Sequence, residues 1–262
     1  MARDKRLIIG NWKMNLDVQG SSLYLHTLAK LIQVRRDVEV VVAPTMLALQ
    51  TLSLQVNLRQ IKLAVQNFYW RDKGPYTGEV SATQLRGIVQ YGLVGHSERR
   101  HVFGETDKDI RAKVQAAIRN HIRPILCIGE TIQERTNGET KMVLDDQLVG
   151  GLANVTSEEL EQVVIAYEPV WAIGTGVNAK PSDVVDAVKT IRREVSQLYG
   201  KKAADNIQVL YGGSITESSA ADYLALDEID GLLIGGASLD EHAFNAIIDK
   251  AHHSDLAKAA KD

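Results

Sequence analysis

The stretch Val163-Val164-Ile165-Ala166-Tyr167-Glu168-Pro169, just past the middle of the 262-residue chain, decides the fold. Its first five residues are apolar and largely β-branched, which predicts a short buried strand. Pro169 has a fixed φ and restricts the residue before it, so Glu168 stands at the carboxyl end of that strand. Ligand sites of α/β folds lie at this end of the strands. Glu168 is therefore a candidate functional acid, although Glu before Pro also occurs in ordinary surface turns.

Similar apolar runs recur along the whole chain. They cover residues 7–12, 38–43, 61–66, 91–95, 123–128, 163–167, 207–211 and 229–234. Between them lie segments long enough for helices, such as 106–120 and 181–199, the second of which opens with Pro181-Ser182-Asp183. Alternating buried strands and helices require parallel strands with right-handed crossovers. Eight such units predict an α/β fold, a single-domain (β/α)8 barrel. An open doubly wound sheet is the alternative, but it would not bring together the polar residues that follow the strands.

Composition narrows the possible partners and compartment. The chain has 30 Lys and Arg against 33 Asp and Glu, a formal net charge of −3, which gives no reason to expect nucleic acid or an anionic membrane as a partner. The one cysteine, Cys127, lies in an apolar run, which excludes an internal disulfide and suits a reducing compartment. No signal-length apolar segment follows the charged amino terminus. We expect a single cytoplasmic domain over residues 1–262, with a polar helical extension from about residue 251.

Polar side chains follow several of the predicted strands. Asn11 and Lys13 stand two residues apart after the first strand, so they share a face and point to the barrel mouth if Ile9 points inward. His96 directly follows the fourth strand. Each of these residues alone could be an ordinary structural or surface residue. Because all of them are predicted to lie on the same rim of the barrel, they are candidates for catalysis. The seven histidines lack His-Glu-x-x-His or Cys/His ligand spacing, so no metal site is expected.

Glycines mark two further features of the same rim. Gly212-Gly213-Ser214 and Gly235-Gly236 follow the last two strands, where adjacent glycines let backbone N–H groups approach an anion. Barrels commonly bind phosphate after strands seven and eight. Gly174-Thr175-Gly176 gives permissive backbone before a helix that begins near Pro181, so the segment after Pro169 is built like a lid.

A long loop follows the third predicted strand. It covers residues 67–80 and begins with Phe68-Tyr69-Trp70, three aromatic residues that would be poorly soluble if exposed. We expect a partner subunit to cover them, with a self-packed Ω-loop as the alternative.

Taken together, these motifs resemble those of triosephosphate isomerases over essentially the whole chain. The matching segments are residues 10–15 (GNWKMN), 77–79 (TGE), 95–100 (GHSERR), 127–130 (CIGE), 167–176 (YEPVWAIGTG), 211–214 (YGGS) and 235–236 (GG). The resemblance implies interconversion of dihydroxyacetone phosphate and D-glyceraldehyde 3-phosphate, in glycolysis and gluconeogenesis, without metal or organic cofactor. It also implies a homodimer with Thr77 at the subunit contact.

The resemblance implies a role for each matching residue. Glu168 would be the base and His96 a neutral electrophile, as is well known for this family. Lys13 would supply fixed positive charge, with Asn11 as its hydrogen-bonding companion and Glu98 in a supporting or proton-relay role. The substrate and its phosphate would be held by Asn11, Lys13, Ile173, Gly174, Ser214, Gly235 and Gly236. The lid would comprise Pro169, Val170, Trp171, Ala172, Thr175 and Gly176.

Three departures from the family pattern carry expectations of their own. Val177-Asn178-Ala179 replaces the usual Lys-Thr-Ala at the end of the lid, which predicts altered hinge kinetics. Pro75 replaces the usual Ala and should stiffen the intersubunit loop. Gly92 stands where the fourth strand usually has a larger residue, and we expect a close contact inside the barrel there.

Two other functions share parts of this pattern. Another sugar-phosphate barrel enzyme would share the glycine phosphate site without the set formed by Asn11, Lys13, His96 and Glu168. A catalytically silent metabolite-binding or adhesion protein on the same scaffold would have lost the base or the lid, and the sequence keeps both.

Overall fold

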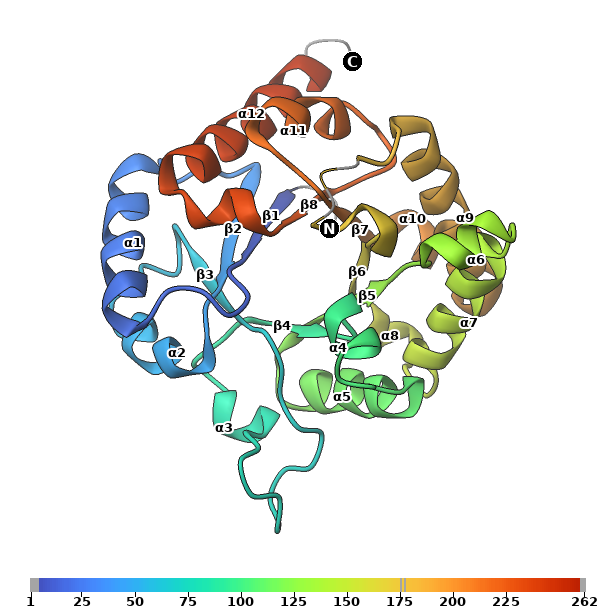
Figure 1. Ribbon diagram of the computed structural model, residues 1–262, viewed down its shortest axis with the longest axis horizontal. Coiled ribbons are helices and arrows are strands. Elements are labelled where there is room, and N and C mark those ends of the chain that lie inside the picture. Colours follow the sequence, from blue (N-terminus) through green and yellow to red (C-terminus); the bar gives the residue numbers. More distant parts are fainter. Residues whose placement is uncertain (1–4, 175, 177, 260–262) are drawn as a thin grey trace.

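The short apolar runs of the sequence form the strands of the structure. The computed structural model describes residues 5–174, 176 and 178–259, with side chains described up to Ser254. In the described chain the strands form a closed, parallel barrel in sequence order, surrounded by helices (Figure 1). The strands are β1 (Arg6–Asn11), β2 (Val38–Ala43), β3 (Lys62–Val65), β4 (Tyr91–Val94), β5 (Arg123–Ile128), β6 (Val164–Tyr167), β7 (Gln208–Gly213) and β8 (Gly231–Ile234). The predicted (β/α)8 barrel is confirmed, and the open sheet is wrong.

Helices follow the strands, and several of them begin at a residue whose side chain caps the helix. Thr106 caps α5 through a reciprocal capping box, and Pro181 occupies the first turn of α9, where its missing N–H costs no hydrogen bond. Among the described residues, no helix is long and apolar enough to cross a membrane. The helices and 3₁₀ segments are α1 (Val18–Leu31), α2 (Met46–Ser53), α3 (Ala82–Leu85), α4 (Ser97–His101), α5 (Asp107–Arg119), α6 (Ile132–Thr136), α7 (Thr140–Leu152), α8 (Ser157–Leu160), η1 (Val170–Ala172), α9 (Pro181–Tyr199), α10 (Lys201–Asn206), α11 (Glu217–Leu224), η2 (Gly236–Leu239) and α12 (Glu241–Ala259).

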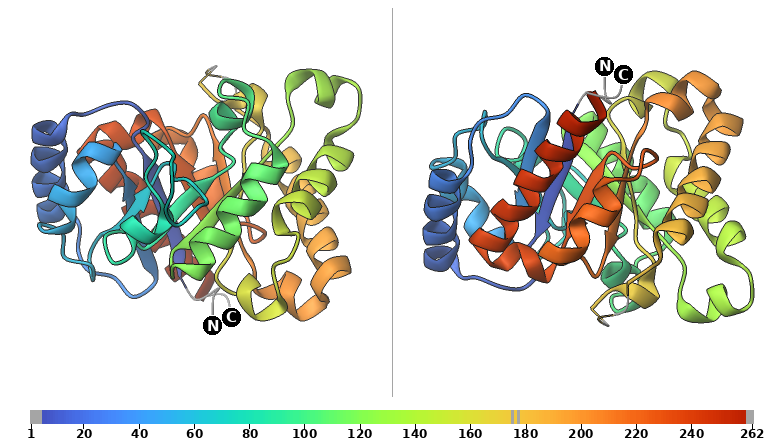
Figure 2. Two further views of the ribbon diagram at one scale, coloured as in Figure 1. Left: turned by 90° about the horizontal axis from the view of Figure 1, so that it is seen from below. Right: turned by 90° about the horizontal axis from the view of Figure 1, so that it is seen from above.

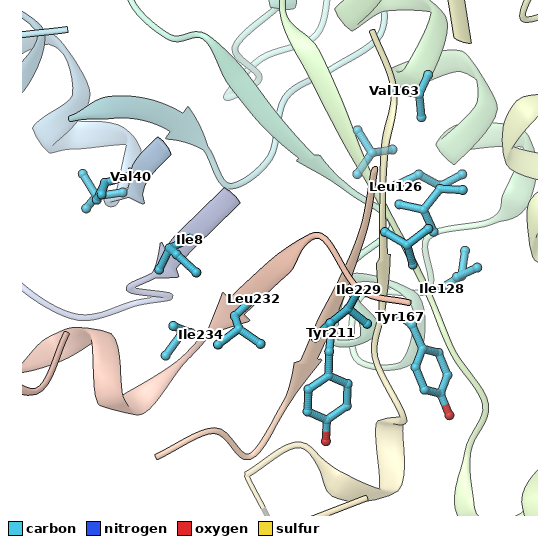
Figure 3. Packing of buried hydrophobic residues seen from close by; sticks show 14 of the residues in the cluster. Ile8, Val40, Leu126, Ile128, Val163, Tyr167, Tyr211, Ile229, Leu232 and Ile234 are labelled. Carbon is cyan, nitrogen blue, oxygen red and sulfur yellow. The ribbon is translucent and has the colours of Figure 1, made fainter. Parts of the chain in front are cut away.

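Two hydrophobic cores hold the barrel together. Alternate strand residues point inward and fill the barrel, among them Ile9, Leu93 and the single cysteine, Cys127. The residues between them point outward and pack with buried helix residues in the second core; Ile8 and Tyr167 of this core are labelled in Figure 3. Because Ile9 points inward, Asn11 two residues later faces the same way, as expected from the sequence.

Gly92 faces outward, so the prediction of a close contact inside the barrel is wrong. Its neighbours Tyr91 and Leu93 occupy the inner face of β4. A Cβ atom on Gly92 would lie 2.9 Å from Cε1 of Phe68 and 3.2 Å from Cγ1 of Val65. The missing side chain therefore makes room for Phe68, the first aromatic residue of the long loop after β3.

That loop extends away from the ring of helices (Figure 1). Phe68 is buried, and the Tyr69 ring stacks on Trp70 and lies tilted against Tyr76, with centroid distances of 4.1 and 4.6 Å. Residues 71–79 are exposed. The aromatic side chains thus pack partly on one another, while the tip of the loop has no cover within its own chain.

Strand register brings the ends of the first, seventh and eighth strands to one level. Gly10 pairs with Ile234, and Gly213 pairs with the same residue. The residues that follow these strands therefore meet at the carboxyl rim. The start of β1 and the end of α12 lie at the other end of the barrel (Figure 2). α12 continues as a helix through Ala259, and His252 Nδ1 lies 2.5 Å from Asp37 Oδ2.

Candidate active site

A cavity of about 410 Å³ opens at the carboxyl rim of the barrel. It brings together side chains and backbone from after β1, β4, β6, β7 and β8. Its lining is Asn11, Lys13, His96, Glu168, Ile173, Gly174, Gly176, Gly213, Ser214, Ile215, Thr216, Leu233, Ile234, Gly235, Gly236 and Ala237. Every residue predicted to catalyse or bind substrate lines it, except Glu98. A larger cavity of about 700 Å³ lies near the amino ends of β5 and β7 and contains none of these residues.

Glu168 is held in place by close backbone packing. Its N–H donates to the carbonyl of Ile128 at 2.8 Å, which continues the pairing of β6 with β5. A Cβ atom on Gly129 would lie 1.8 Å from the Glu168 carbonyl oxygen, and one on Gly212 would lie 3.0 Å from its Cγ. Only glycine fits at position 129, because the atom that a Cβ would meet there belongs to the backbone of Glu168 and cannot move aside. The two glycines therefore leave the space in which Glu168 lies.

The Glu168 carboxylate is buried and contacts two groups from the start of α4. Oε1 lies 3.2 Å from His96 Nε2, and Oε2 accepts a 3.3 Å hydrogen bond from the Ser97 N–H. Burial raises the pKa of Glu168, but His96, the Ser97 N–H and Lys13 together lower it below its ordinary value. Glu168 is therefore a carboxylate, ready to accept a proton.

A hydrogen bond to the His96 ring determines which ring nitrogen carries the hydrogen when the imidazole is neutral. The backbone N–H of Glu98 donates to Nδ1 at 3.3 Å, so a neutral ring has its hydrogen on Nε2, facing Glu168. Burial lowers the pKa of His96, but the Glu168 carboxylate raises it above its ordinary value of 6.5. This direction differs from the neutral imidazole expected from the sequence. The physical reason is that Glu168 lies against His96 in this conformation.

Lys13 has a left-handed backbone with φ of 52°, a conformation that is unfavourable for residues other than glycine. Its N–H donates to Asn11 Oδ1 at 3.1 Å. Its carbonyl accepts from Gln66 Nε2 at 2.8 Å, and the same nitrogen donates to the Ala43 carbonyl at 2.8 Å. The Lys13 ammonium is 2.6 Å from Glu98 Oε1. Glu98 therefore contacts the site through both Lys13 and His96.

The first half of the expected lid is anchored to a buried carboxylate. The Trp171 indole N–H donates to Glu130 Oε1 at 2.9 Å, and the Tyr167 hydroxyl lies 3.2 Å from both Glu130 oxygens. Arg135 lies over the Trp171 ring at 4.5 Å. Burial raises the pKa of Glu130, although these donors partly oppose the rise. The anchor holds Trp171 on the body of the barrel.

Two glycines in the second half of the expected lid have left-handed backbones. Gly174 and Gly176 have φ of 69° and 74°, in the region that favours glycine. Thr175 and Val177 lie outside the described residues. Beyond them the Ala179 carbonyl accepts a 2.8 Å hydrogen bond from the Tyr223 hydroxyl, which fixes the far end of the segment. Pro169, Val170 and Ala172 lie in and beside η1, in the first part of the segment that the sequence predicts as a lid.

Thr77 lies in the exposed tip of the loop after β3 and does not line the cavity of its own chain. No group of three or more His, Cys, Asp or Glu side chains suited to a metal ion occurs among the described residues. Pro75 is exposed in the same loop tip.

Sequence reasoning missed several contributors to the site. Ser97 and Glu130 lie within motifs that the sequence singled out, but their contacts with Glu168 and Trp171 come from the fold. Gln66 ends the third apolar run and has no local pattern that marks it. Leu233 also lines the cavity, and only its inward position on β8 predicts this.

Comparisons with known proteins agree with this geometry. A sequence profile described as Triosephosphate isomerase matches residues 6–251. A triosephosphate isomerase of Chloroherpeton thalassium is 43% identical over 249 residues, which cover 94% of this chain and 99% of the relative. Those of Trichlorobacter lovleyi and Caldanaerobacter subterraneus subsp. tengcongensis are each 40% identical, covering 92% and 93% of this chain and 97% and 98% of their own. From the barrel, the rim and these matches together, we conclude that the chain belongs to the triosephosphate isomerase family.

Proposed function

We propose that the chain performs its family's reaction, the interconversion of dihydroxyacetone phosphate and D-glyceraldehyde 3-phosphate, with Glu168 as the base. One observation carries this assignment: a buried carboxylate, an imidazole and an ammonium group share one cavity with two glycine turns. Moving a carbonyl between adjacent carbons requires removal of a C–H proton and stabilisation of an enediolate. The cavity offers a group for each requirement.

Glu168 takes the proton from the carbon next to the carbonyl and returns it to the neighbouring carbon. His96 donates the Nε2 hydrogen to the carbonyl oxygen and then moves a proton between the two oxygens. To reach substrate, the Glu168 carboxylate must leave Ser97 and His96. His96 then loses the larger of the two carboxylates that raise its pKa and keeps the smaller effect of Glu98, while burial and the Lys13 charge continue to lower it. This change gives the neutral imidazole that the mechanism requires.

Lys13 supplies positive charge opposite the developing oxyanion and the phosphate. Asn11 holds the backbone of Lys13 and lines the same wall. Backbone N–H groups around Gly174, Ser214, Gly235 and Gly236 hold the phosphate, since glycine backbone lets an anion approach closely. Ile173 and the rest of the lid close over the bound substrate and exclude water, which protects the enediolate from losing its phosphate. Glu98 keeps the ammonium of Lys13 in place.

The working unit that we propose is a homodimer in the cytoplasm. The loop after β3 has an uncovered tip containing Thr77, and Met14 and Phe103 are 94% and 65% exposed on the same rim. A second copy that receives the loop beside Asn11 and His96 would cover these side chains. Sedimentation at assay concentration should give a dimer, and a fully active monomer would sink this part of the proposal. The cytoplasm is supported by the single buried cysteine and by a role in glycolysis.

A coupled assay tests the proposal directly. Purified protein should convert D-glyceraldehyde 3-phosphate to dihydroxyacetone phosphate without added metal or cofactor. Turnover of a different sugar phosphate alone would favour another barrel enzyme, and phosphate binding without turnover would favour a silent binding protein.

A further inference from the structure

A buried tyrosine on α1 supports the turn that follows β8. The Tyr24 hydroxyl donates a 2.7 Å hydrogen bond to the Ser238 carbonyl, and both residues are buried. The Tyr24 ring also packs edge-on against Trp12, with centroids 4.6 Å apart. α1 thereby contacts η2, the 3₁₀ segment that begins at Gly236.

Ser238 in turn fixes the peptide between Gly235 and Gly236. Its N–H and its hydroxyl both donate to the Gly235 carbonyl, at 2.8 and 2.6 Å. In a trans peptide the C=O and N–H groups point in opposite directions. A Gly235 carbonyl turned toward Ser238 therefore directs the Gly236 N–H the other way, and Gly236 lines the cavity. Apart from Gly236 itself and its chain neighbours, no heavy atom lies within 4 Å of the place where a Cβ on Gly236 would be, so the space on that side of the residue is open.

The turn is also confined on its inner side. A Cβ on Gly10 would lie 2.9 Å from Ser238 Cβ and 3.1 Å from Phe244 Cζ, so the backbone of β1 packs directly on the turn. Ser238 is thus held between β1 and the Tyr24 hydroxyl. Removing that hydroxyl leaves one side of the turn without its hydrogen bond.

We propose that Tyr24 is a positioning residue for phosphate binding, acting through Ser238 to aim the N–H groups of the Gly235–Gly236 turn. The inference rests on the proposed function, because it takes the bound anion to be the phosphate of the substrate. Burial, with Glu241 and Asp240, raises the pKa of Tyr24, so its hydroxyl remains a donor at working pH.

The test is Tyr24→Phe, which keeps the ring against Trp12 and removes only the donor. The dissociation constant for inorganic phosphate, measured by calorimetry, should rise by about three- to tenfold, as expected when hydrogen bonds to a charged group are weakened. The kcat/KM for D-glyceraldehyde 3-phosphate should fall by a similar factor, mainly through KM. Turnover of D-glyceraldehyde, which has no phosphate, should be unchanged.

Tyr199→Phe is the matched control. The Tyr199 hydroxyl also donates to backbone carbonyls, those of Leu152 and Val155 at 3.0 and 3.1 Å, but it has no contact with the turn after β8. It should leave phosphate binding unchanged. Ser238→Ala is a second variant, which removes one of the two donors to Gly235. Its effect on phosphate binding should combine less than additively with that of Tyr24→Phe, because both act on one turn.

Three outcomes would overturn the inference. They are unchanged phosphate affinity in folded Tyr24→Phe, an equal loss in Tyr199→Phe, and an equal loss of turnover with D-glyceraldehyde. Phosphate calorimetry needs no turnover, so wild-type protein that binds phosphate but does not isomerise would refute the proposed function and still test Tyr24.

Discussion

Gln66→Met should weaken catalysis through the backbone of Lys13. Gln66 Nε2 donates to the carbonyls of Lys13 and Ala43, both at 2.8 Å. A left-handed backbone costs a residue with a side chain about 1–2 kcal/mol, and the one hydrogen bond that Gln66 donates to the Lys13 carbonyl contributes about 0.5–1.5 kcal/mol. Because the two quantities are similar, removing this hydrogen bond removes the advantage of the observed Lys13 conformation. Methionine keeps the length of the side chain and lacks the donors.

The expected loss follows from these magnitudes. If about 1.4 kcal/mol of preference for the observed Lys13 conformation is lost, the competent population falls about tenfold. We therefore expect kcat/KM to fall by about tenfold. The Lys13 carbonyl, left without this donor, should also lower the free energy of unfolding in urea by about 1–3 kcal/mol, whereas the Ala43 carbonyl keeps the Trp12 N–H as a donor at 3.1 Å.

Gln60→Met is the matched control for this experiment. Gln60 Nε2 also donates to two carbonyls, those of Ala29 and Ile32 at 2.6 and 2.7 Å, away from the cavity. It should lose stability without losing kcat/KM. Wild-type kcat/KM in folded Gln66→Met, or the same loss of kcat/KM in both variants, would refute the positioning of Lys13 by Gln66.

Three more predictions concern the site and the lid. In Glu168→Gln the pKa of His96, followed by NMR, should fall below 6.5, since burial and Lys13 then dominate; an unchanged value would contradict the pairing. In wild-type protein the raised pKa of His96 adds stability that is full below pH 6.5 and lost as pH rises through the raised value, and the unfolding free energy of Glu168→Gln should lack this decline. Restoring the family hinge with Val177→Lys and Asn178→Thr should change kcat by less than about tenfold, or ~1.4 kcal/mol in barrier, with little change in the isotope effect for proton transfer. A loss of several orders of magnitude would show that these residues take part in the chemistry.

The strands were predictable because each is a local apolar run. β2 and β5 have the predicted bounds, and the other strands begin or end within a few residues of them. β7 continues to Gly213, two residues past its predicted end, because pairing of Gly213 with Ile234 outweighs the poor strand preference of glycine. The prediction for Gly92 was wrong because the sequence around it does not show which face of β4 it occupies.

Site residues were predictable only where they lie next to the end of a strand. Glu168, His96 and Lys13 follow strands directly, so the closed barrel was enough to bring them together. Gln66 acts on a residue 53 positions away, and Tyr24 acts on one 214 positions away. Such contacts depend on packing between distant segments, for which a single sequence gives no local signal.

The role of Glu168 is tested most directly by the kcat of Glu168→Gln. Glutamine keeps the shape of the side chain and cannot accept the substrate proton, and a positioned general base contributes about 10²- to 10⁴-fold. We expect wild-type protein to isomerise D-glyceraldehyde 3-phosphate and the variant to lose at least about a hundredfold in kcat, with inorganic phosphate bound as tightly as before. A variant that folds, binds phosphate and retains a tenth of the wild-type kcat would contradict the assignment of Glu168 as the base.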